Sequence, residues 1–151
     1  MWTTEHTAEP EATPEAVWAA IEDLHRGTMN SPTSDRFELH GPFEVGTELS
    51  VTPQGQGTFR SRIIELVPRE VYADETAFGD ITLLFRHTLE AIDGGTRVTH
   101  RLEISGPTSD QVGPELGAQI SEDFPEAMQA LFAWAGERQG EKGVGHESRT
   151  A

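Results

Sequence analysis

The chain has 151 residues, and its 11 Lys and Arg against 26 Asp and Glu give a formal net charge of −15. This length predicts one domain with a substantial core, and this charge disfavours binding to a nucleic-acid backbone or to an anionic membrane surface. The chain contains no Cys, which excludes disulfides, thiolate metal sites and a cysteine nucleophile.

Neither a secretory signal nor a membrane span is expected. The beginning of the chain lacks basic and apolar signal regions, and the longest strongly apolar run, residues 81–85, is far shorter than the ~20 residues of a transmembrane helix. We therefore expect a cytoplasmic protein without membrane insertion. Residues 139–151 are glycine-rich and polar, which predicts a disordered tail after a domain at 1–138.

The first predicted elements are a strand and a helix. Residues 2–8 alternate between two faces, with Trp2 and His6 on the same one. Thr13 is a typical N-cap residue and Pro14 suits the first helical position, so a helix is expected to start there. Its apolar stripe is Val17, Trp18, Ile21 and Leu24.

A run of strands follows this helix. Turn residues at 79–80 and at 94–95 separate segments that alternate in polarity, which is typical of antiparallel hairpins. The predicted strands are 37–43, 48–53, 58–67, 71–78, 81–92 and 96–105. In 58–67, the sequence leaves open whether Arg60 and Arg62 or Ser61 and Ile63 face inward.

A long helix is expected from Pro114 to Arg138, with Pro125 kinking it. Its apolar stripe is Leu116, Ile120, Phe124, Ala127 or Met128, Leu131 and Trp134. The element order predicts an α+β fold in which a curved antiparallel sheet of about six to seven strands wraps around this helix.

Several short motifs in this order resemble the helix-grip superfamily of START domains and birch-pollen allergens, whose bacterial members are described as SRPBCC proteins, "polyketide cyclase/dehydrase and lipid transport". The motifs are Thr13–Trp18, 41–46, 65–68 with 71–72, 85–90, 94–100 and 124–131. The resemblance runs from about residue 2 to 137. It implies a helix-grip fold with a cavity for an apolar small molecule. It implies no single reaction, because such proteins range from carriers to enzymes.

The sequence also gives its own reason to expect a cavity. Pro125 would bow the long helix, and the nearby Gly117, Ala118 and Ala127 are small, so the helix cannot fill a strongly curved sheet. We expect a ligand cavity beneath residues 116–128. A turn at 79–80 places Tyr72 opposite His87.

The same turn pairs Asp74 with Phe85, again on the inner face. A loop centred on 94–95 places His87 opposite Leu102 and Leu89 opposite His100, so the two histidines become diagonal neighbours. The resemblance places the first and last strands side by side, which would bring His6 toward the same region. The predicted ligand-binding residues are Tyr72, Asp74, Phe85, His87, Leu89, His100, Leu102, Leu116, Ile120, Phe124 and Met128.

Two functions remain open for this cavity. In one, the protein binds a small hydrophobic molecule such as a lipid, polyketide or aromatic metabolite. In the other, it is a polyketide cyclase- or dehydratase-like enzyme, with His87, His100 and Tyr72 as candidate catalytic residues, since histidine titrates near neutrality. His25, His40 and His146 are expected to be solvated.

Other chemistry has less support. No HxxxH or HxH spacing supports a metal site, no Gly-x-Ser-x-Gly is present, and the glycine-rich segments have the context of hairpin turns, so no cofactor is expected. A third interpretation is an interaction module whose acidic surface binds a basic partner. A homodimer is left open.

Overall fold

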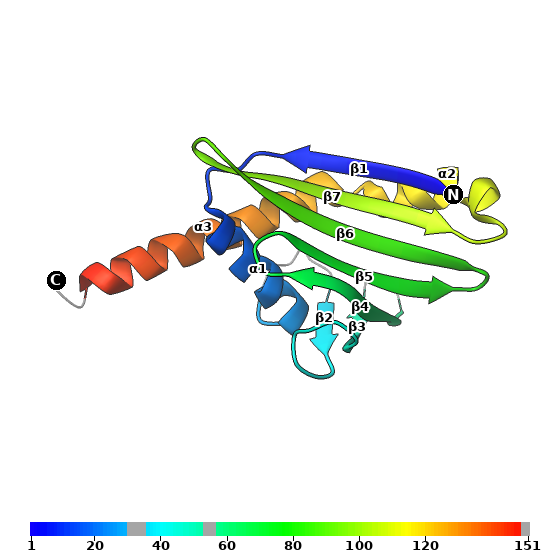
Figure 1. The fold of residues 1–151 in the computed structure, drawn as a ribbon, viewed down its shortest axis with the longest axis horizontal. Coiled ribbons are helices and arrows are strands. Elements are labelled where there is room, and N and C mark those ends of the chain that lie inside the picture. Colours follow the sequence, from blue (N-terminus) through cyan, green and yellow to red (C-terminus); the bar gives the residue numbers. More distant parts are fainter. Residues whose placement is uncertain (30–35, 53–56, 149–151) are drawn as a thin grey trace.

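The computed structural model describes residues 1–29, 36–52 and 57–148, with side chains described as far as Glu137. In this part of the chain, seven strands form one antiparallel sheet in the order β1-β7-β6-β5-β4-β3-β2 (Figure 1). The strands are β1 (Trp2–Ala8), β2 (Arg36–Leu39), β3 (Glu48–Thr52), β4 (Phe59–Val67), β5 (Val71–Phe78), β6 (Ile81–Ile92) and β7 (Gly95–Ser105).

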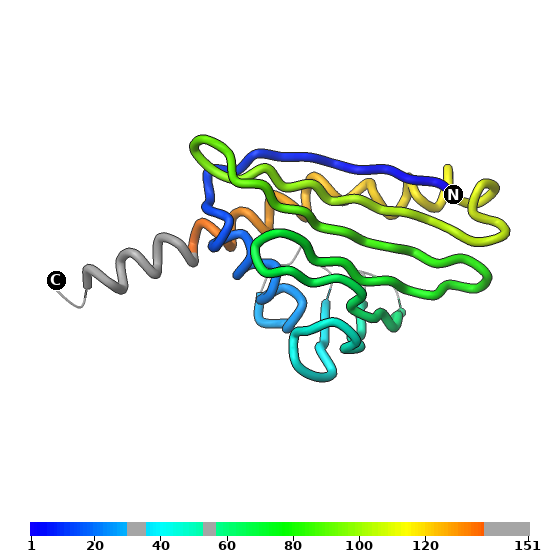
Figure 2. Tube along the Cα trace, viewed as in Figure 1, coloured from blue at the N-terminus to red at the C-terminus, as the bar shows by residue number. Residues whose placement is uncertain are grey.

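Three helices accompany the sheet: α1 (Pro14–Arg26), α2 (Ser109–Ser121) and α3 (Phe124–Ser148). In Figure 2, α2 and the first part of α3 run along one face of the sheet, behind β1, β7 and β6. The predicted architecture, a curved antiparallel sheet around a long C-terminal helix, is confirmed. The tail expected at 139–151 stays a prediction. No helix in the described segments is long and apolar enough to cross a membrane.

The start of α1 follows the predicted capping chemistry. The Thr13 side chain accepts a hydrogen bond from the Ala16 amide at 3.2 Å, and Pro14 occupies the first turn, where its missing amide hydrogen costs no helical bond. The helix ends at Gly27, whose φ of 81° is strained for any other residue. This short helix has one buried face, which includes Val17 and Ile21.

The hairpin between β6 and β7 differs from the prediction. Ile92 pairs with Gly95, so the turn is centred on Asp93 and Gly94, and His87 lies directly opposite His100. Of the two central residues only Gly94 has positive φ, and Gly95 belongs to the strand. A side chain at Gly95 would overlap the Pro10 carbonyl. The register is two residues from the predicted one, which keeps every residue on its predicted face.

The β5–β6 pairing agrees with the prediction, with Tyr72 opposite His87. Between β4 and β5 the register shifts by one residue at Ile63 to Glu65, which is a β-bulge. In the part of β4 before the bulge, Ser61 and Ile63 are buried while the neighbouring arginines are exposed. In the structure, Ser61 and Ile63 therefore face inward, which answers the question that the sequence left open.

The C-terminal helix is divided directly before Pro125, the residue predicted to kink it. The break lies between α2 and α3, just before Pro125, and α2 begins at Ser109, five residues before the predicted start. Pro125 is the second residue of α3, where no helical hydrogen bond requires its amide. Gly117 contributes no space to the cavity, because the Trp2 ring packs against it.

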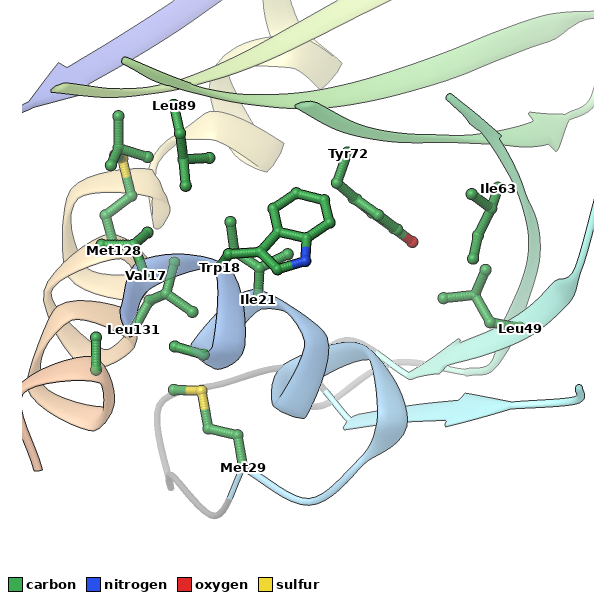
Figure 3. Packing of buried hydrophobic residues seen from close by; sticks show 13 residues of the cluster. Val17, Trp18, Ile21, Met29, Leu49, Ile63, Tyr72, Leu89, Met128 and Leu131 are labelled. Atoms are coloured by element: carbon green, nitrogen blue, oxygen red, sulfur yellow. The ribbon is translucent and has the colours of Figure 1, made fainter. Parts of the chain in front are cut away.

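Most of the core lies where α1 meets the sheet and α3. Figure 3 shows Val17, Trp18 and Ile21 of α1 close to Leu89 of the sheet and Met128 and Leu131 of α3. A second cluster, with Leu102 and Ile104 at its centre, lies near α2. The cavity described below extends between these two packed regions.

Candidate functional site

A cavity of about 270 Å³ lies between the sheet and the C-terminal helices. Every layer of the fold contributes to its wall, and most of the contributed side chains are apolar. The lining residues are Leu24, His25, Phe37, Val51, Phe59, Ser61, Asp74, Thr76, Phe78, Leu83, Phe85, His87, His100, Leu116, Gln119, Ile120, Asp123, Phe124, Ala127, Met128 and Leu131. The predicted position beneath residues 116–128 is confirmed.

Most of the predicted ligand-binding residues lie on this wall: Asp74, Phe85, His87, His100, Leu116, Ile120, Phe124 and Met128. Tyr72, Leu89 and Leu102 do not, because they are packed into the core behind it. His6 pairs with His100 across β1 and β7 but is also not part of the wall. The alternation of residues therefore predicted correctly which side chains of these strands face inward. It did not predict which of them line the cavity and which are packed in the core.

His25 is the largest departure from the sequence prediction. It was expected to be solvated, yet only 2% of its surface is exposed and it lines the cavity. Its Nδ1–H donates to the Ile21 carbonyl at 2.7 Å, and its ring lies 4.1 Å from the Tyr72 ring and 4.7 Å from the Phe37 ring, centre to centre. A satisfied donor and aromatic neighbours make burial of a neutral imidazole favourable.

Tyr72, Asp74 and His25 form a polar cluster inside the apolar wall. The Tyr72 hydroxyl donates to Asp74 Oδ2 at 2.7 Å, and His25 Nε2 lies 4.0 Å from the same oxygen. Since Nδ1 of His25 carries the proton given to Ile21, Nε2 of the neutral ring faces Asp74 with its lone pair. At 4.0 Å this nitrogen is beyond hydrogen-bond distance of Asp74, so among the described residues Tyr72 is the group that hydrogen-bonds the carboxyl.

Burial changes the acidity of this cluster. Loss of hydration raises the pKa of Asp74 to about 7, although the hydrogen bond from Tyr72 acts in the opposite direction. Burial also raises the pKa of Tyr72, and the charge of Asp74 adds to this effect. The pKa of His25 falls to about 4, chiefly through burial. Asp74 is therefore the member of the cluster that titrates near neutral pH.

His87, His100 and Phe124 form a second feature of the wall, a stack of three rings. The His87 and His100 rings are 4.0 Å apart, and His100 is 4.0 Å from Phe124 at an angle of 15°. Burial lowers the pKa of His100 to about 3 and that of His87 well below its usual range. Both rings are uncharged at neutral pH, and His87 Nδ1 and His100 Nε2 have no hydrogen-bond partner among the described residues.

Ser61 and Thr76 form a third polar group in the wall. Their hydroxyls are hydrogen-bonded to each other across β4 and β5. The described residues contain no group of three or more His, Asp or Glu placed to hold a metal ion. Sequence reasoning missed 13 of the wall residues: six come from β2 to β4 and the end of α1, and the other seven from β5, β6 and the α2–α3 region. Alternation signals were present at Val51 and Phe59, but nothing local shows how far these short strands curve around the helix.

Comparison with solved structures confirms the fold. The chain is similar to Ara h 8.0201, with a TM-score of 0.72 and 17% identity over 88% of this chain and 96% of that one. It is similar to the Zhui aromatase/cyclase from Streptomyces sp. R1128, with a TM-score of 0.68 and 17% identity over 90% and 94% of the two chains.

A third similar structure is the norcoclaurine synthase of Thalictrum flavum, with a TM-score of 0.63 and 14% identity over 91% and 95% of the two chains. At such identities the likeness concerns the fold alone. No curated protein matches the sequence. Residues 1–133 match the family described as "Polyketide cyclase / dehydrase and lipid transport", and the chain therefore belongs to this family.

Proposed function

We propose that the protein binds a small, largely apolar molecule in the cavity between the sheet and the α2–α3 helices. The observation that carries the proposal is the composition of the wall, which is apolar over most of its area and polar at Asp74, His87 and the Ser61–Thr76 pair. Such a combination is typical of ligand sites, in which apolar contact gives affinity and a few polar groups fix orientation.

The size of the cavity limits the ligand. A volume of about 270 Å³ is at the lower end of the range of roughly 300–1,000 Å³ for small-molecule sites. It suits a compact molecule of one or two rings better than a long-chain lipid. The aromatic rings of Phe85 and Phe124 are part of the wall and would contact such a molecule. Each Å² of apolar ligand surface removed from water contributes about 25 cal/mol.

The test is to fill the cavity from α3. Ala127 lies on the wall and Ala133 is exposed on the same helix, so Ala127→Phe and Ala133→Phe make a matched pair. We expect Ala127→Phe to weaken binding of an environment-sensitive naphthalene dye at least about tenfold, equal to about 1.4 kcal/mol, and Ala133→Phe to leave it unchanged.

Native mass spectrometry of the purified wild-type protein would show whether a ligand co-purifies and give its mass. Equal dye binding by both variants, measured by fluorescence titration with folding checked by circular dichroism, would show that the ligand binds elsewhere. The proposal would then be wrong.

A second candidate function is acid–base catalysis on a bound carbonyl compound, and the Tyr72–Asp74–His25 cluster favours it. As a carboxylate, Asp74 would take an α proton from a ketone, and the resulting enolate would attack a second carbonyl of the same molecule. Asp74 would then return the proton to the alkoxide. A base with a pKa near the working pH is the most effective one, which favours Asp74 over His87 and His100.

The experiment is turnover of a small aromatic diketone by wild type, Asp74→Asn and His87→Gln. Acid–base catalysis by Asp74 predicts a loss of kcat of about 10²–10⁴-fold in Asp74→Asn and a smaller loss in His87→Gln. The wild-type pH–rate profile should show an apparent pKa near 7, which Asp74→Asn should remove. Full turnover by Asp74→Asn would exclude the mechanism.

A further inference from the structure

The charged side chains that line the cavity are all acidic. Its carboxylates are Asp74 on β5 and Asp123 at the junction of α2 and α3, while the described wall contains no Lys or Arg. An anionic ligand would therefore meet the buried Asp74 carboxyl and no compensating cation among the described wall residues.

Asp74 lacks the partner that a buried carboxylate usually has. Only 4% of its surface is exposed, and Asp is rarely buried to this extent unless it is paired. Its contacts are the Tyr72 hydroxyl, which is neutral, and His25, whose Nε2 lies 4.0 Å away. Burial keeps the His25 ring uncharged at neutral pH, because it lowers its pKa to about 4.

His87 gives an independent indication that a hydrogen-bonding partner is missing from the cavity. It lines the cavity and is 93% buried, as its exposed fraction is 7%, yet its Nδ1 has no partner among the described residues. In the tautomer that carries its proton on Nε2, Nδ1 is an acceptor, and a ligand N–H group would supply the donor that this nitrogen lacks. An alkylammonium has three N–H donors, enough to serve a carboxylate and an imidazole from one position.

We propose that the cavity selects a small aromatic ligand with a protonated amine, a proposal that rests on the binding function proposed above. The ammonium group pairs with Asp74 while the aromatic ring lies against the aromatic side chains of the wall. The rings available to it include Phe85 and Phe124, and an ammonium near aromatic faces gains further cation–π attraction. Asp123 and the net charge of −15 favour entry of a cation.

Three probes of nearly equal shape test the charge preference: naphthylethylamine, ethylnaphthalene and naphthylacetate. They are titrated into the full chain at pH 8 and followed by calorimetry or by naphthalene fluorescence. We expect the amine to bind at least about tenfold more tightly than the neutral probe, and the carboxylate to bind most weakly. Tighter binding of the carboxylate or of the neutral probe would overturn the proposal while leaving the binding function intact. Binding of none of the three would overturn both.

Asp74→Asn removes the charge at nearly constant shape, and Asp93→Asn in the exposed β6–β7 turn is its matched control. The amine should lose at least about tenfold in affinity in Asp74→Asn, the neutral probe should change by less than about threefold, and Asp93→Asn should resemble wild type. An unchanged amine affinity in folded Asp74→Asn would contradict the pairing.

A pH series on the wild type gives the same test without a substitution. The titratable groups around Asp74 are Tyr72 on its own strand, His25 on α1 and His87 on β6, and all three keep one charge state between pH 6 and 8. Amine affinity relative to the neutral probe should therefore rise from pH 6 to pH 8 as Asp74 ionises. A ratio that is constant across this range would contradict the proposal.

Discussion

Three buried or partly buried histidines, His25, His87 and His100, are held in their neutral form by burial. The pKa falls to about 4 for His25 and about 3 for His100, and it also falls for His87. In the unfolded chain each would titrate near ~6.5. At these three residues the unfolded state therefore binds more protons than the folded state once the pH drops below this value, so their titration lowers the free energy of unfolding in acid. Asp74, whose pKa burial raises to about 7, contributes in the opposite direction.

This acid sensitivity can be tested at a single residue. Between pH 6.5 and about 4, His25 alone should lower the free energy of unfolding by up to about 1.4 kcal/mol for each pH unit. His25→Phe keeps an aromatic ring between Tyr72 and Phe37 but cannot be protonated. We expect the acid side of its stability curve, measured by urea denaturation from pH 4 to 8, to be less steep than that of wild type.

The matched control is His40→Phe. His40 is exposed and bonded to Ser50 at 2.7 Å, so its replacement should leave the acid slope unchanged. An unaltered slope in His25→Phe would mean that His25 carries a proton in the folded protein.

The same residue shows why part of the site could not be predicted. Strand alternation placed Asp74, His87 and His100 on the inner face, because a period of two specifies a side without knowledge of the partner strands. His25 precedes Arg26 and Gly27 at a helix end, which is a polar context. Its burial depends on Tyr72, which is remote in sequence, and no local pattern records this contact.

At the level of elements, two glycines allow α2 to pack closely against Trp2 of the sheet. Gly113 and Gly117 are one turn apart on α2, and a Cβ atom on either would overlap the side chain of Trp2 on β1. These glycines reduce helix propensity, and in return they allow the indole to lie against the helix backbone. The position of the cavity wall formed by Leu116 and Ile120 depends on this contact.

Two glycine-to-alanine substitutions separate packing from helix propensity. At Gly117 the added methyl group meets Trp2, so we expect a loss of stability of about 1–3 kcal/mol, the usual cost of overpacking. At Gly136 on α3 nothing lies within 4 Å, so alanine should stabilise by up to about 1 kcal/mol. Thermal melts of both variants give the comparison, and a stable Gly117→Ala would show that α2 can shift without cost.

Element boundaries followed from local chemistry where that chemistry was strong. The Thr13 cap and the turn at Gly79 and Asp80 were predicted correctly. The β6–β7 turn and the start of α2 were not. Gly95 belongs to β7 and lies against Pro10, a residue far away in sequence, and α2 continues through Pro114. In both cases a tertiary contact or a tolerated proline overrode the local signal.

For the molecule as a whole, part of the acidic charge is paired with arginines on the outer face of the sheet. Arg101 bonds Glu5 and Glu103, and Arg97 bonds Glu9 and Glu90, so arginines of β7 join acidic groups of neighbouring segments. These pairs are mostly exposed, and exposed pairs contribute little, about 0–1 kcal/mol each. Most of the acidic groups have no such compensation, since Asp and Glu exceed Lys and Arg by 15.

Salt should therefore stabilise the protein. Screening weakens the self-repulsion of a chain with a net charge of −15 more than it weakens the few exposed ion pairs. We expect the Tm to rise between about 0.02 M and about 0.5 M NaCl, measured at constant pH by circular dichroism. A falling Tm would indicate that the ion pairs on the outer face outweigh the repulsion.

The global fold could be predicted from the sequence more fully than the set of residues that line the cavity. Strand order and an enclosed space follow from hairpin turns, from alternation and from the resemblance of motifs along most of the chain. The chemistry of the wall depends on the depth of each inward side chain. Tyr72 and Asp74, two residues apart on β5, share a face, yet only Asp74 reaches the cavity.

The pairing of β1 with β7 also has a consequence for how the protein folds. Trp2 pairs with Ile104, so β1 finds its partner only after about a hundred further residues have been added. The helices that close the cavity are made later still. Pairings of such long sequence separation form slowly, because a long loop must close first. We expect the sheet to be completed only after synthesis of β7, and the cavity to become enclosed only after synthesis of α3, with the apolar face of β6 and β7 exposed until then.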